Sequence, residues 1–351
     1  MSGLRVLTGR QVLQLLDGRD AELVAAVTDA YRAHADGLTE LPHSMFLRFP
    51  DRPADRIIAL PAYLGGPADV AGVKWISSFP ANVAAGKERA SAVVVLNSMT
   101  DGRPRLIAEG SVISARRTAA GAVLAAGLLH QGERSPVVGA VGCGRIQFEI
   151  LRFLCSYGPR PDHVVLVDLD PRRRDRLAGA IAGWGVTCTE APDIDTALRA
   201  CDIVSFATTA STPHVAGLGG CPQGATILHV SLRDLTAEAV AGCDNVVDDA
   251  DHVCRAATSL DLAVQKFGHR DFVRTSIGEI LAGRQPARTG GERPVVFSPF
   301  GLGILDLAVA RLVETLAAQV GAGLLVEDFQ PDDWAPDPLV AAMADGRADD
   351  T

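Results

Sequence analysis

The feature that most constrains the fold is a regular alternation of apolar and amphipathic segments between residues 136 and 299. Apolar runs such as PVVGAV and HVVLVDLD are separated by stretches whose apolar residues recur at helical spacing. Strands that are apolar throughout are buried on both faces, as in a parallel sheet covered by helices. The alternation therefore predicts an α/β domain with a doubly wound parallel sheet of the Rossmann type.

A different pattern precedes this region. The first forty residues have helical spacing, and Thr8 with Gln11 resembles a capping box. From about 44 to 110, short β-type runs follow one another, and the turn TDGR at 100–103 joins the last two as a hairpin. These runs predict a second, α+β domain with a mostly antiparallel sheet and no βαβ unit.

Two long helical segments connect these regions. An Ala-rich helix over 111–130, capped by Ser111 or Ser114, leads into the parallel sheet, and a helix over 304–321 returns toward the first region. A chain of 351 residues is longer than one typical core, so two domains are expected. We predict a substrate-binding and dimerisation domain over 1–130 plus 308–351, and a dinucleotide-binding domain over 131–307.

Charge and cysteine usage exclude several classes of protein. The net charge of −9 disfavours a nucleic-acid partner, because no broad basic surface would neutralise phosphates. Seven cysteines are scattered without a CxxC pair or a His/Cys cluster, so we expect reduced thiols and no metal. No apolar run approaches the length of a membrane span, and no secretory signal is recognisable. We therefore expect a cytoplasmic protein that acts on a small molecule.

The stretch VVGAVGCGRIQFE has the features of a dinucleotide-binding loop, because it follows an apolar strand and opens a helix. Gly142 permits the tight turn, and Gly144 lets the backbone approach a pyrophosphate. The first N–H groups of the helix, at Arg145 and Ile146, would bind the anion. Gln147 replaces the third glycine of the fingerprint, which serves mainly helix–strand packing. The alternative is a strand–turn–helix that binds no nucleotide.

Asp168 supports the nucleotide interpretation and indicates which cofactor is bound. It closes the next predicted strand, 24 positions after Gly144, close to the spacing of a ribose-binding carboxylate. Such a carboxylate accepts hydrogen bonds from both ribose hydroxyls and repels a 2′-phosphate, which favours NAD. Arg172–Arg174 follow closely and keep NADP open as the alternative.

Isolated cations in apolar surroundings indicate where a substrate binds. Lys74, Arg48 and Arg117 each stand in such a setting, and a cation there must find an anion or reach water. A structural ion pair explains any one of them taken alone. All three precede the cofactor domain, which favours a carboxylate-binding pocket at the domain cleft. His43 lies near Arg48 and could touch the substrate, or be an ordinary polar histidine.

Several motifs resemble the ornithine cyclodeaminase/μ-crystallin family, and they occur in the same order over nearly the whole chain. They are GVKWISSFPAN, SARRTAA, the Gly142/Gly144 turn, HVSLRDL and SPFGLGILDLA. Within the family, the motifs are most similar to those of the diaminopropionate-biosynthesis branch. Its members are N-(2-amino-2-carboxyethyl)-L-glutamate dehydrogenases, which act beside a phosphoserine-dependent synthase. The resemblance implies an NAD-dependent enzyme that serves siderophore or peptide natural-product biosynthesis. It also implies a homodimer in which the antiparallel sheets of two chains pack together.

The resemblance also implies roles for individual residues. Lys74, Arg48 and Arg117 correspond to contacts with the substrate carboxylate, with Lys74 also taking part in catalysis. Asp234 corresponds to the catalytic aspartate, although an aspartate there could instead be the N-cap of a helix. The residues that fall where the cofactor is held are Thr118, Thr208, Thr209 and Ser231.

One departure from the family bears on the reaction. Members that cyclise ornithine carry a glutamate in the strand matching RIIALPAYLGG, and Ala59 is the matching position here. Loss of that acid disfavours cyclisation and leaves oxidation of a secondary amine possible. The alternatives are an ornithine cyclodeaminase, an alanine dehydrogenase or a ketimine reductase, and, from another class, a non-enzymatic ligand-binding protein like the lens μ-crystallins.

Overall fold

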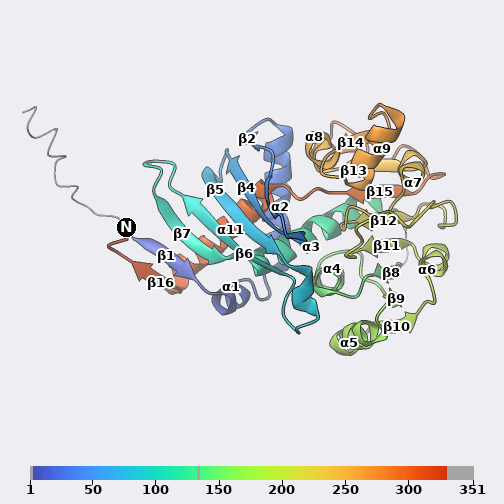
Figure 1. Cartoon of the computed structure of the whole chain (residues 1–351), viewed down its shortest axis with the longest axis horizontal. Coiled ribbons are helices and arrows are strands. Elements are labelled where there is room, and N and C mark those ends of the chain that lie inside the picture. Colours follow the sequence, from blue (N-terminus) through green and yellow to red (C-terminus); the bar gives the residue numbers. More distant parts are fainter. Residues whose placement is uncertain (1–2, 133–134, 330–351) are drawn as a thin grey trace, which may run out of the picture.

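The computed structural model describes residues 3–132 and 135–329. Its strands form two separate sheets, one mostly antiparallel and one parallel, with helices on both (Figure 1). The predicted α/β class with two kinds of sheet is confirmed. The first sheet takes its strands from residues 4–109 and 324–326 and the second from 137–298. We propose that the two sheets are the cores of the two domains.

The first sheet has the order β16-β1-β7-β6-β5-β4-β2, with β3 beside β4, and all neighbours are antiparallel except β1 and β7. The predicted hairpin at 100–103 joins β6 to β7. The expectation that the first forty residues are helical is wrong for LRVL, which pairs with β7 and β16 as a strand. The strands are β1 (Leu4–Leu7), β2 (Thr39–Glu40), β3 (Met45–Phe49), β4 (Arg52–Leu64), β5 (Val70–Ser78), β6 (Ala90–Asn97), β7 (Pro104–Glu109) and β16 (Leu324–Val326).

The helices that accompany this sheet are α1 (Gly9–Leu15), α2 (Asp20–Ala35), η1 (Pro80–Val83), α3 (Gly110–Leu129) and α11 (Gly303–Val320). The predicted capping box of Thr8 and Gln11 opens α1. The caps predicted for α3 are wrong, because the helix begins before Ser111. Its N-cap is Glu109, whose carboxylate accepts hydrogen bonds from the backbone N–H groups of Ser111 and Val112.

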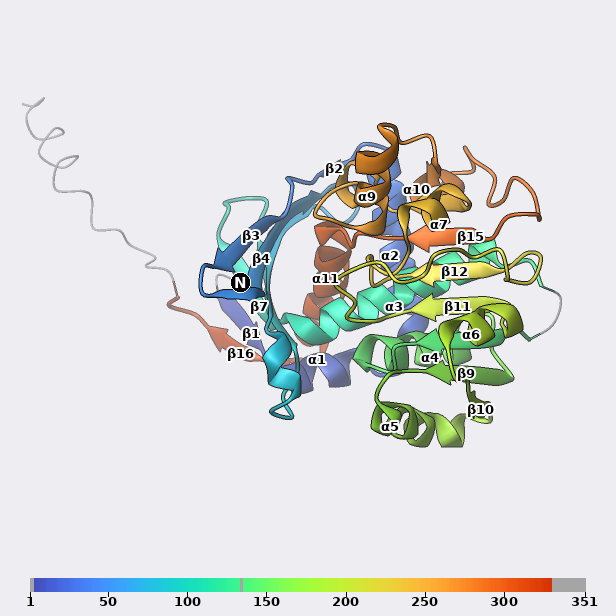
Figure 2. The ribbon, with the colours of Figure 1, turned by 45° about the vertical axis from the view of Figure 1, so that its right-hand side comes forward.

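α3 is a core helix, although its length and composition would allow it to cross a membrane. Within its most apolar window, 67% of the residues are buried inside the protein. The expectation that no apolar run approaches this length therefore needs correction. Figure 2 shows α3 and α11 lying between the two sheets. The apolar residues of α3 are therefore buried where the two halves of the molecule meet.

The second sheet is parallel throughout, with the order β10-β9-β8-β11-β12-β15-β13-β14. β14 was not expected, because VRTS has three consecutive polar residues and lacks an apolar run. The strands are β8 (Val137–Val141), β9 (His163–Val167), β10 (Thr187–Glu190), β11 (Ile203–Phe206), β12 (Thr226–His229), β13 (Asp244–Val247), β14 (Val273–Ser276) and β15 (Val295–Ser298). The helices are α4 (Arg145–Ser156), α5 (Pro171–Ile181), η2 (Ala182–Trp184), α6 (Ile194–Ala200), α7 (Ala237–Ala241), α8 (Ala250–Val253), α9 (Ser259–Phe267) and α10 (Ile277–Leu281).

The strand order fixes where a ligand would bind. Moving outward from β8, the chain first builds β9 and β10 on one side and then crosses to β11 on the other. In doubly wound sheets, ligands bind beyond the carboxyl ends of the strands at this reversal. The loops after β8, β9 and β11 are therefore the ones to inspect for a cofactor.

Candidate active site

A cavity of about 200 Å³ lies between the two sheets. Its walls come from β3 to β5 of the first sheet, from α3, and from the loops that follow β12, α8 and β15. Among its lining residues are Arg56, Lys74, Arg117, Arg233 and Gly301. A larger hollow of about 300 Å³ beside α1 and the end of α11 is lined by no buried charged residue, so we take the cavity between the sheets as the candidate site.

The floor of the cavity is a buried cluster of charges. Lys74 Nζ lies 2.6 Å from Asp306 Oδ2, and Arg117 Nε lies 3.2 Å from Oδ1 of the same carboxylate. Lys74 is 2% exposed, and Asp306 is fully buried. Burial, and then the charge of Arg117, lower the pKa of Lys74 to about 8 against the opposing effect of Asp306. Two cations therefore share one anion, and the cluster carries a net positive charge.

The loop after β15 holds Arg117 in place. Gly301 has φ +94°, and a Cβ added there would lie 2.7 Å from Nη1 of Arg117, so the backbone is in close contact with the guanidinium. The buried carboxylate of Asp248, at the end of β13, accepts hydrogen bonds from the N–H groups of Phe300 (2.8 Å) and Gly301 (2.7 Å). Asp248, which follows a strand of the second sheet, thus fixes the loop after β15.

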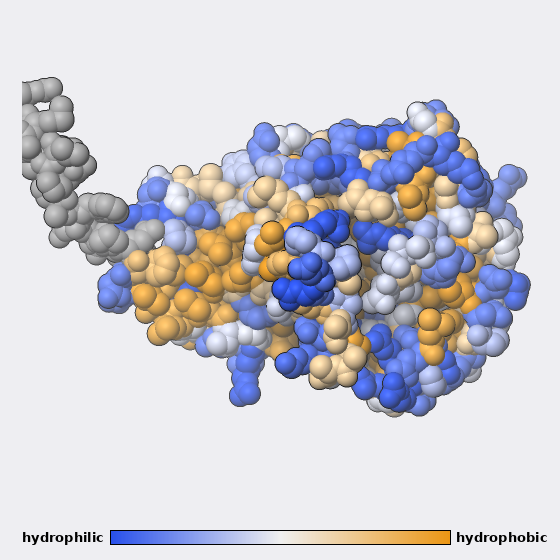
Figure 3. All heavy atoms as spheres, viewed as in Figure 1, coloured by the Kyte–Doolittle hydropathy of each residue, from blue (hydrophilic) through white to orange (hydrophobic). Residues whose placement is uncertain are grey.

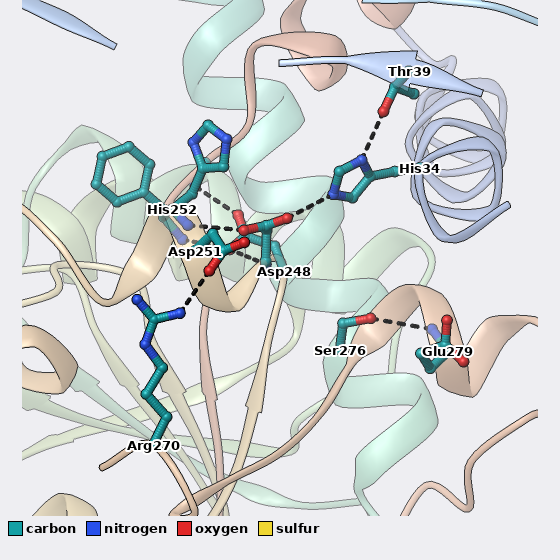
Figure 4. A network of polar contacts seen from close by, with 11 residues as sticks. His34, Thr39, Asp248, Asp251, His252, Arg270, Ser276 and Glu279 are labelled. Atoms are coloured by element: carbon teal, nitrogen blue, oxygen red, sulfur yellow. Dashed lines mark hydrogen bonds and ion pairs between the residues drawn. The ribbon is translucent and has the colours of Figure 1, made fainter. Parts of the chain in front are cut away.

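A polar network beside this loop connects the two halves of the molecule (Figure 4). His34 of α2 lies 3.0 Å from Asp249 Oδ2 through Nε2 and 2.7 Å from Thr39 Oγ1 through Nδ1. Next to it, His252 packs against Phe300 on one side and against His43 on the other, with the His43 ring centroid 5.3 Å away. His43 therefore lies at this wall, on the far side of His252, and is not among the residues that line the cavity.

The glycine loop has the geometry that a dinucleotide requires. Gly142 has φ +86°, and a Cβ there would lie 2.7 Å from the carbonyl oxygen of Ala207, so the position needs glycine. Gly144 is the N-cap of α4, and no atom lies within 4 Å of where its Cβ would be. Asp168 accepts a hydrogen bond from the N–H of Cys143 at 2.8 Å. Open space before a helix N-terminus, with a carboxylate beside it, fits a pyrophosphate and an adjacent ribose.

The other residues predicted to hold the cofactor differ in their exposure and in their contacts with the protein. Arg145 is exposed and lies 3.8 Å from Glu149, and Ile146 is half-buried. The hydroxyl of Thr118 donates to the carbonyl of Ser114 within α3, and Thr209 is exposed. Their contacts with a cofactor stay predictions.

Two of the arginines that kept NADP open are bound to acids. Arg172 pairs with Asp170 at 3.0 Å, and Arg174 pairs with Glu190 at 2.8 Å. Gln147, at the third-glycine position, is fully buried, in keeping with a packing role.

Asp234 is fully buried, and its carboxylate accepts hydrogen bonds from Thr208 Oγ1 and Ser231 Oγ. Nε2 of His229 lies 3.3 Å from Oδ2, and Nε2 of His214 lies 3.8 Å from Oδ1. Burial acts to raise the pKa of Asp234, but the contacts with His229, Ser231 and Thr208 outweigh it and hold the pKa below its ordinary value. The carboxylate is therefore ionised at neutral pH.

The alternative explanation of Asp234 as a helix cap is wrong. α7 begins at Ala237, and its N-cap is Thr236, whose side chain accepts a hydrogen bond from the N–H of Ala239. A buried carboxylate with several hydroxyl and histidine contacts and no capping role is a candidate for chemistry.

The residues predicted from sequence are only partly brought together. Lys74 and Arg117 meet in the cavity, whereas Arg48 is exposed at its edge, opposite Arg56. Sequence reasoning missed Asp306, Arg56 and Arg233. The motifs GILDLA and SLRDL contain two of these residues, and the presence of Arg48 and Arg56 in consecutive predicted strands is the signal that could have found the third.

The interpretation of Ala59 also needs correction. Ala59 pairs with Met45 and Trp75, on the face of the sheet opposite to Lys74. Successive residues of a strand point to opposite faces, so position 59 is directed away from the cavity. The neighbouring residues that do line it are Ile58 and Leu60, both apolar. This stretch of β4 therefore offers the cavity no acid.

Known proteins resemble the chain over almost its whole length. The alanine dehydrogenase of Archaeoglobus fulgidus is 28% identical over 335 residues, which cover 93% of this chain and 98% of the relative. The N-((2S)-2-amino-2-carboxyethyl)-L-glutamate dehydrogenase of Staphylococcus aureus is also 28% identical, over 312 residues that cover 86% of this chain and 91% of the relative. Identity therefore does not choose between these two substrates.

A solved structure that contains bound NAD shares the fold. The archaeal alanine dehydrogenase dimer with bound NAD superposes with a TM-score of 0.84 and 27% identity, covering 93% of this chain and all of that one. Its cofactor agrees with the prediction of NAD. The model of the ornithine cyclodeaminase/mu-crystallin family matches residues 6–320. The chain belongs to the ornithine cyclodeaminase/mu-crystallin family.

Proposed function

We propose that the protein catalyses the NAD-dependent oxidative cleavage of N-(2-amino-2-carboxyethyl)-L-glutamate to L-2,3-diaminopropionate and 2-oxoglutarate. The observation that carries this proposal is the charge of the cavity. Four cationic residues line it (Arg56, Lys74, Arg117 and Arg233), and the lining contains no acidic residue. The proposed substrate carries three carboxylates, which complement this charge.

The same charge pattern disfavours the cyclodeaminase alternative. The side-chain amine of ornithine is cationic and would need an acid beside it. Asp306 is the carboxylate nearest this charge cluster, and both of its oxygens already bind Lys74 and Arg117. A small uncharged side chain, as in alanine, is compatible with the Lys74–Arg117 cluster alone, so an alanine dehydrogenase is the second candidate.

In the proposed reaction, the α-carbon of the glutamate half would give up a hydride, which is the chemistry that NAD⁺ supplies when it is bound. The amine loses its proton, and a carbon–nitrogen double bond forms. Water then adds to that carbon, and the bond between carbon and nitrogen breaks. The nitrogen leaves with the diaminopropionate, and the carbon becomes the keto group of 2-oxoglutarate. Overall, one NAD⁺ and one water are consumed, and one NADH and one proton are released.

The chain's own residues would position the substrate and move its protons. Lys74 and Arg117 would bind the carboxylate on the reacting carbon, with Asp306 holding both cations in place. Such positioning can lower the barrier by several kcal/mol. Asp234 would accept the protons of the amine and of the water. Because Asp234 is fully buried, while Thr208 and Ser231 are only partly buried, these hydroxyls would pass the protons inward.

A substrate panel tests this function. We expect NADH absorbance to appear when the protein and NAD⁺ are mixed with the diaminopropionate–glutamate conjugate. No absorbance is expected with alanine, ornithine or glutamate. NADH formed with alanine would support the second candidate, and proline formed from ornithine would contradict the proposal. Tight NAD binding without turnover of any substrate would instead favour a ligand-binding protein.

The role of Asp234 has its own test. Asp234→Asn keeps the size of the side chain and removes its basicity, so kcat should fall at least 100-fold, a typical effect of losing a general base. The Kd for NAD⁺, measured by fluorescence titration, should stay within about twofold of the wild-type value, because the fold is preserved. Retention of kcat in a variant that binds NAD⁺ normally would show that Asp234 is not the base.

We further propose that the protein is a homodimer, formed through the outer face of the first sheet. On this face Ala59 is paired with Met45 on one side and with Trp75 on the other, and Met45 and Trp75 are 65% and 42% exposed. Figure 3 shows hydrophobic residues gathered over the first sheet on the side facing the viewer. A continuous apolar surface of this kind is typical of a protein–protein interface.

Sedimentation velocity tests the proposed dimer. We expect wild-type protein to sediment as a dimer and Met45→Asp to sediment as a monomer, because an unpaired carboxylate would be buried in the interface. Met99→Asp is the matched control. Met99 is 45% exposed in the turn between β6 and β7, so this variant should remain dimeric. A monomeric wild type would exclude the interface.

A further inference from the structure

Four guanidinium groups gather at one edge of the cavity, and among the described residues none of them forms an ion pair with an acid. Arg48 and Arg56 stand directly opposite each other on β3 and β4. Like charges in directly opposed positions destabilise a sheet. Within the described residues, the charged groups that act on Arg56 are Arg48, Arg89 and Arg233, all of them cations. Burial and these three charges lower the pKa of Arg56 below its usual range.

The cluster extends along one row of the sheet. Arg56 is paired across the next strand with Ser78, and the hydroxyl of Ser78 accepts a hydrogen bond from Nη1 of Arg89 at 2.8 Å. Ser78 is buried, so Arg89 is directed into the edge of the cavity rather than into solvent. Three arginines from three chain segments therefore converge on the cavity face of the first sheet.

The fourth arginine comes from the opposite wall and is held by the backbone. The guanidinium of Arg233 donates to the carbonyl oxygens of Ala256 at 2.8 Å and Ala257 at 3.0 Å. Ala256, Ala257 and Leu232 all have positive φ (58°, 54° and 74°), a conformation that costs on the order of 1 kcal/mol or more for each residue. Strain of this kind persists where the surroundings impose it, so the loop holds Arg233 in a defined orientation.

This cluster is distinct from the one on the cavity floor. Lys74 and Arg117 share the carboxylate of Asp306, whereas Arg56 and Arg233, which both line the cavity, have no such anion in the part of the chain that the structure describes. An arrangement in which cations repel one another in the free protein is stabilised when an anion binds between them. An anionic ligand would supply the missing counter-charge.

We infer that Arg56 and Arg233, supported by Arg48 and Arg89, form a second anion site that binds a carboxylate other than the one on the reacting carbon. The inference rests on the proposed function and extends it, because it makes this site the determinant of specificity for substrates with two or more carboxylates. Substrates with one carboxylate would use the Lys74–Arg117 cluster and leave the second site empty.

Arg56→Met tests the site, because methionine preserves much of the packing and removes the charge. We expect kcat/KM for the conjugate to fall by about 10- to 100-fold, the effect of losing a charge-assisted hydrogen bond. Two analogues, with the γ-carboxylate or the diaminopropionate carboxylate replaced by a carboxamide, are compared in both proteins. The analogue that lacks the carboxylate bound by Arg56 should be a poor substrate of the wild-type protein. Its kcat/KM should change little in Arg56→Met, because the interaction that the substitution removes is already missing. Equal losses on all three compounds would overturn the inference.

Two controls separate the site from the fold. Arg103→Met removes an exposed arginine in the turn between β6 and β7, and kcat/KM should not change. The melting temperature of ligand-free Arg56→Met should equal or exceed that of wild type, because the substitution relieves repulsion. A large fall in melting temperature would contradict the idea that Arg56 lacks a protein partner.

A binding measurement keeps the inference testable if the conjugate is not turned over. In the presence of NADH, 2-oxoglutarate should bind wild-type protein at least ten times more tightly than pyruvate, because only the former has a second carboxylate. Arg56→Met should bring the two affinities close together. Equal affinities in wild type, or an unchanged preference in the variant, would overturn the second anion site, whatever reaction the protein catalyses.

Discussion

The carboxylate of Asp306 is the group on which the candidate site depends. It is fully buried on α11 and binds Lys74 of β5 and Arg117 of α3, so three elements far apart in sequence meet at one point. Removing one partner from a buried ion cluster typically costs about 3–5 kcal/mol, because it leaves an uncompensated charge. The cluster is therefore both a structural joint between α3, α11 and the first sheet and the source of positive charge in the cavity.

The cluster of Lys74, Arg117 and Asp306 would hold a substrate carboxylate in a defined position. The two helices that carry Arg117 and Asp306 lie between the sheets, and the backbone at Gly301 packs against the guanidinium of Arg117 from the other side. The glycine loop follows β8 and Asp168 follows β9, which are neighbouring strands of the parallel sheet. A carboxylate bound by Lys74 and Arg117 would thus be positioned relative to the cofactor by packed helices and strands, which is the arrangement that catalysis by orientation requires.

Charge balance separates the candidate substrates more sharply than sequence identity does. Relatives of equal identity act on alanine and on a tricarboxylic amino-acid conjugate. The Lys74–Arg117 cluster would bind the carboxylate of any 2-amino acid. Among the described residues, the arginines at the cavity edge have no acidic partner, and a further anion would balance them. Repulsion between these arginines destabilises the ligand-free protein, and destabilising features of this kind are expected at functional sites.

Hydrophobic periodicity was sufficient to predict the two sheets, the glycine loop and the connecting helices, because these depend on local pattern. It failed for LRVL and VRTS, whose strand conformation comes from pairing with distant segments. The site was harder to predict, because strand register decides which side chains share a face. The observed strand register directs Ala59 away from the cavity. Arg56, three positions earlier on the same strand, lines the cavity instead. Asp306 stands among apolar residues at the start of α11, and the tertiary contacts with Lys74 and Arg117 reveal its role.

The most direct test of this account is the pKa of Lys74. The chain contains three lysines (Lys74, Lys87 and Lys266), so an NMR titration of lysine labelled at Cε resolves each one. Lys74 should titrate with a pKa of about 8 in the wild-type protein. In Asp306→Asn its pKa should be lower still, because the carboxylate that favours the charged form is gone. A pKa near 10.5 that Asp306→Asn leaves unchanged would contradict the buried cluster on which the candidate site depends.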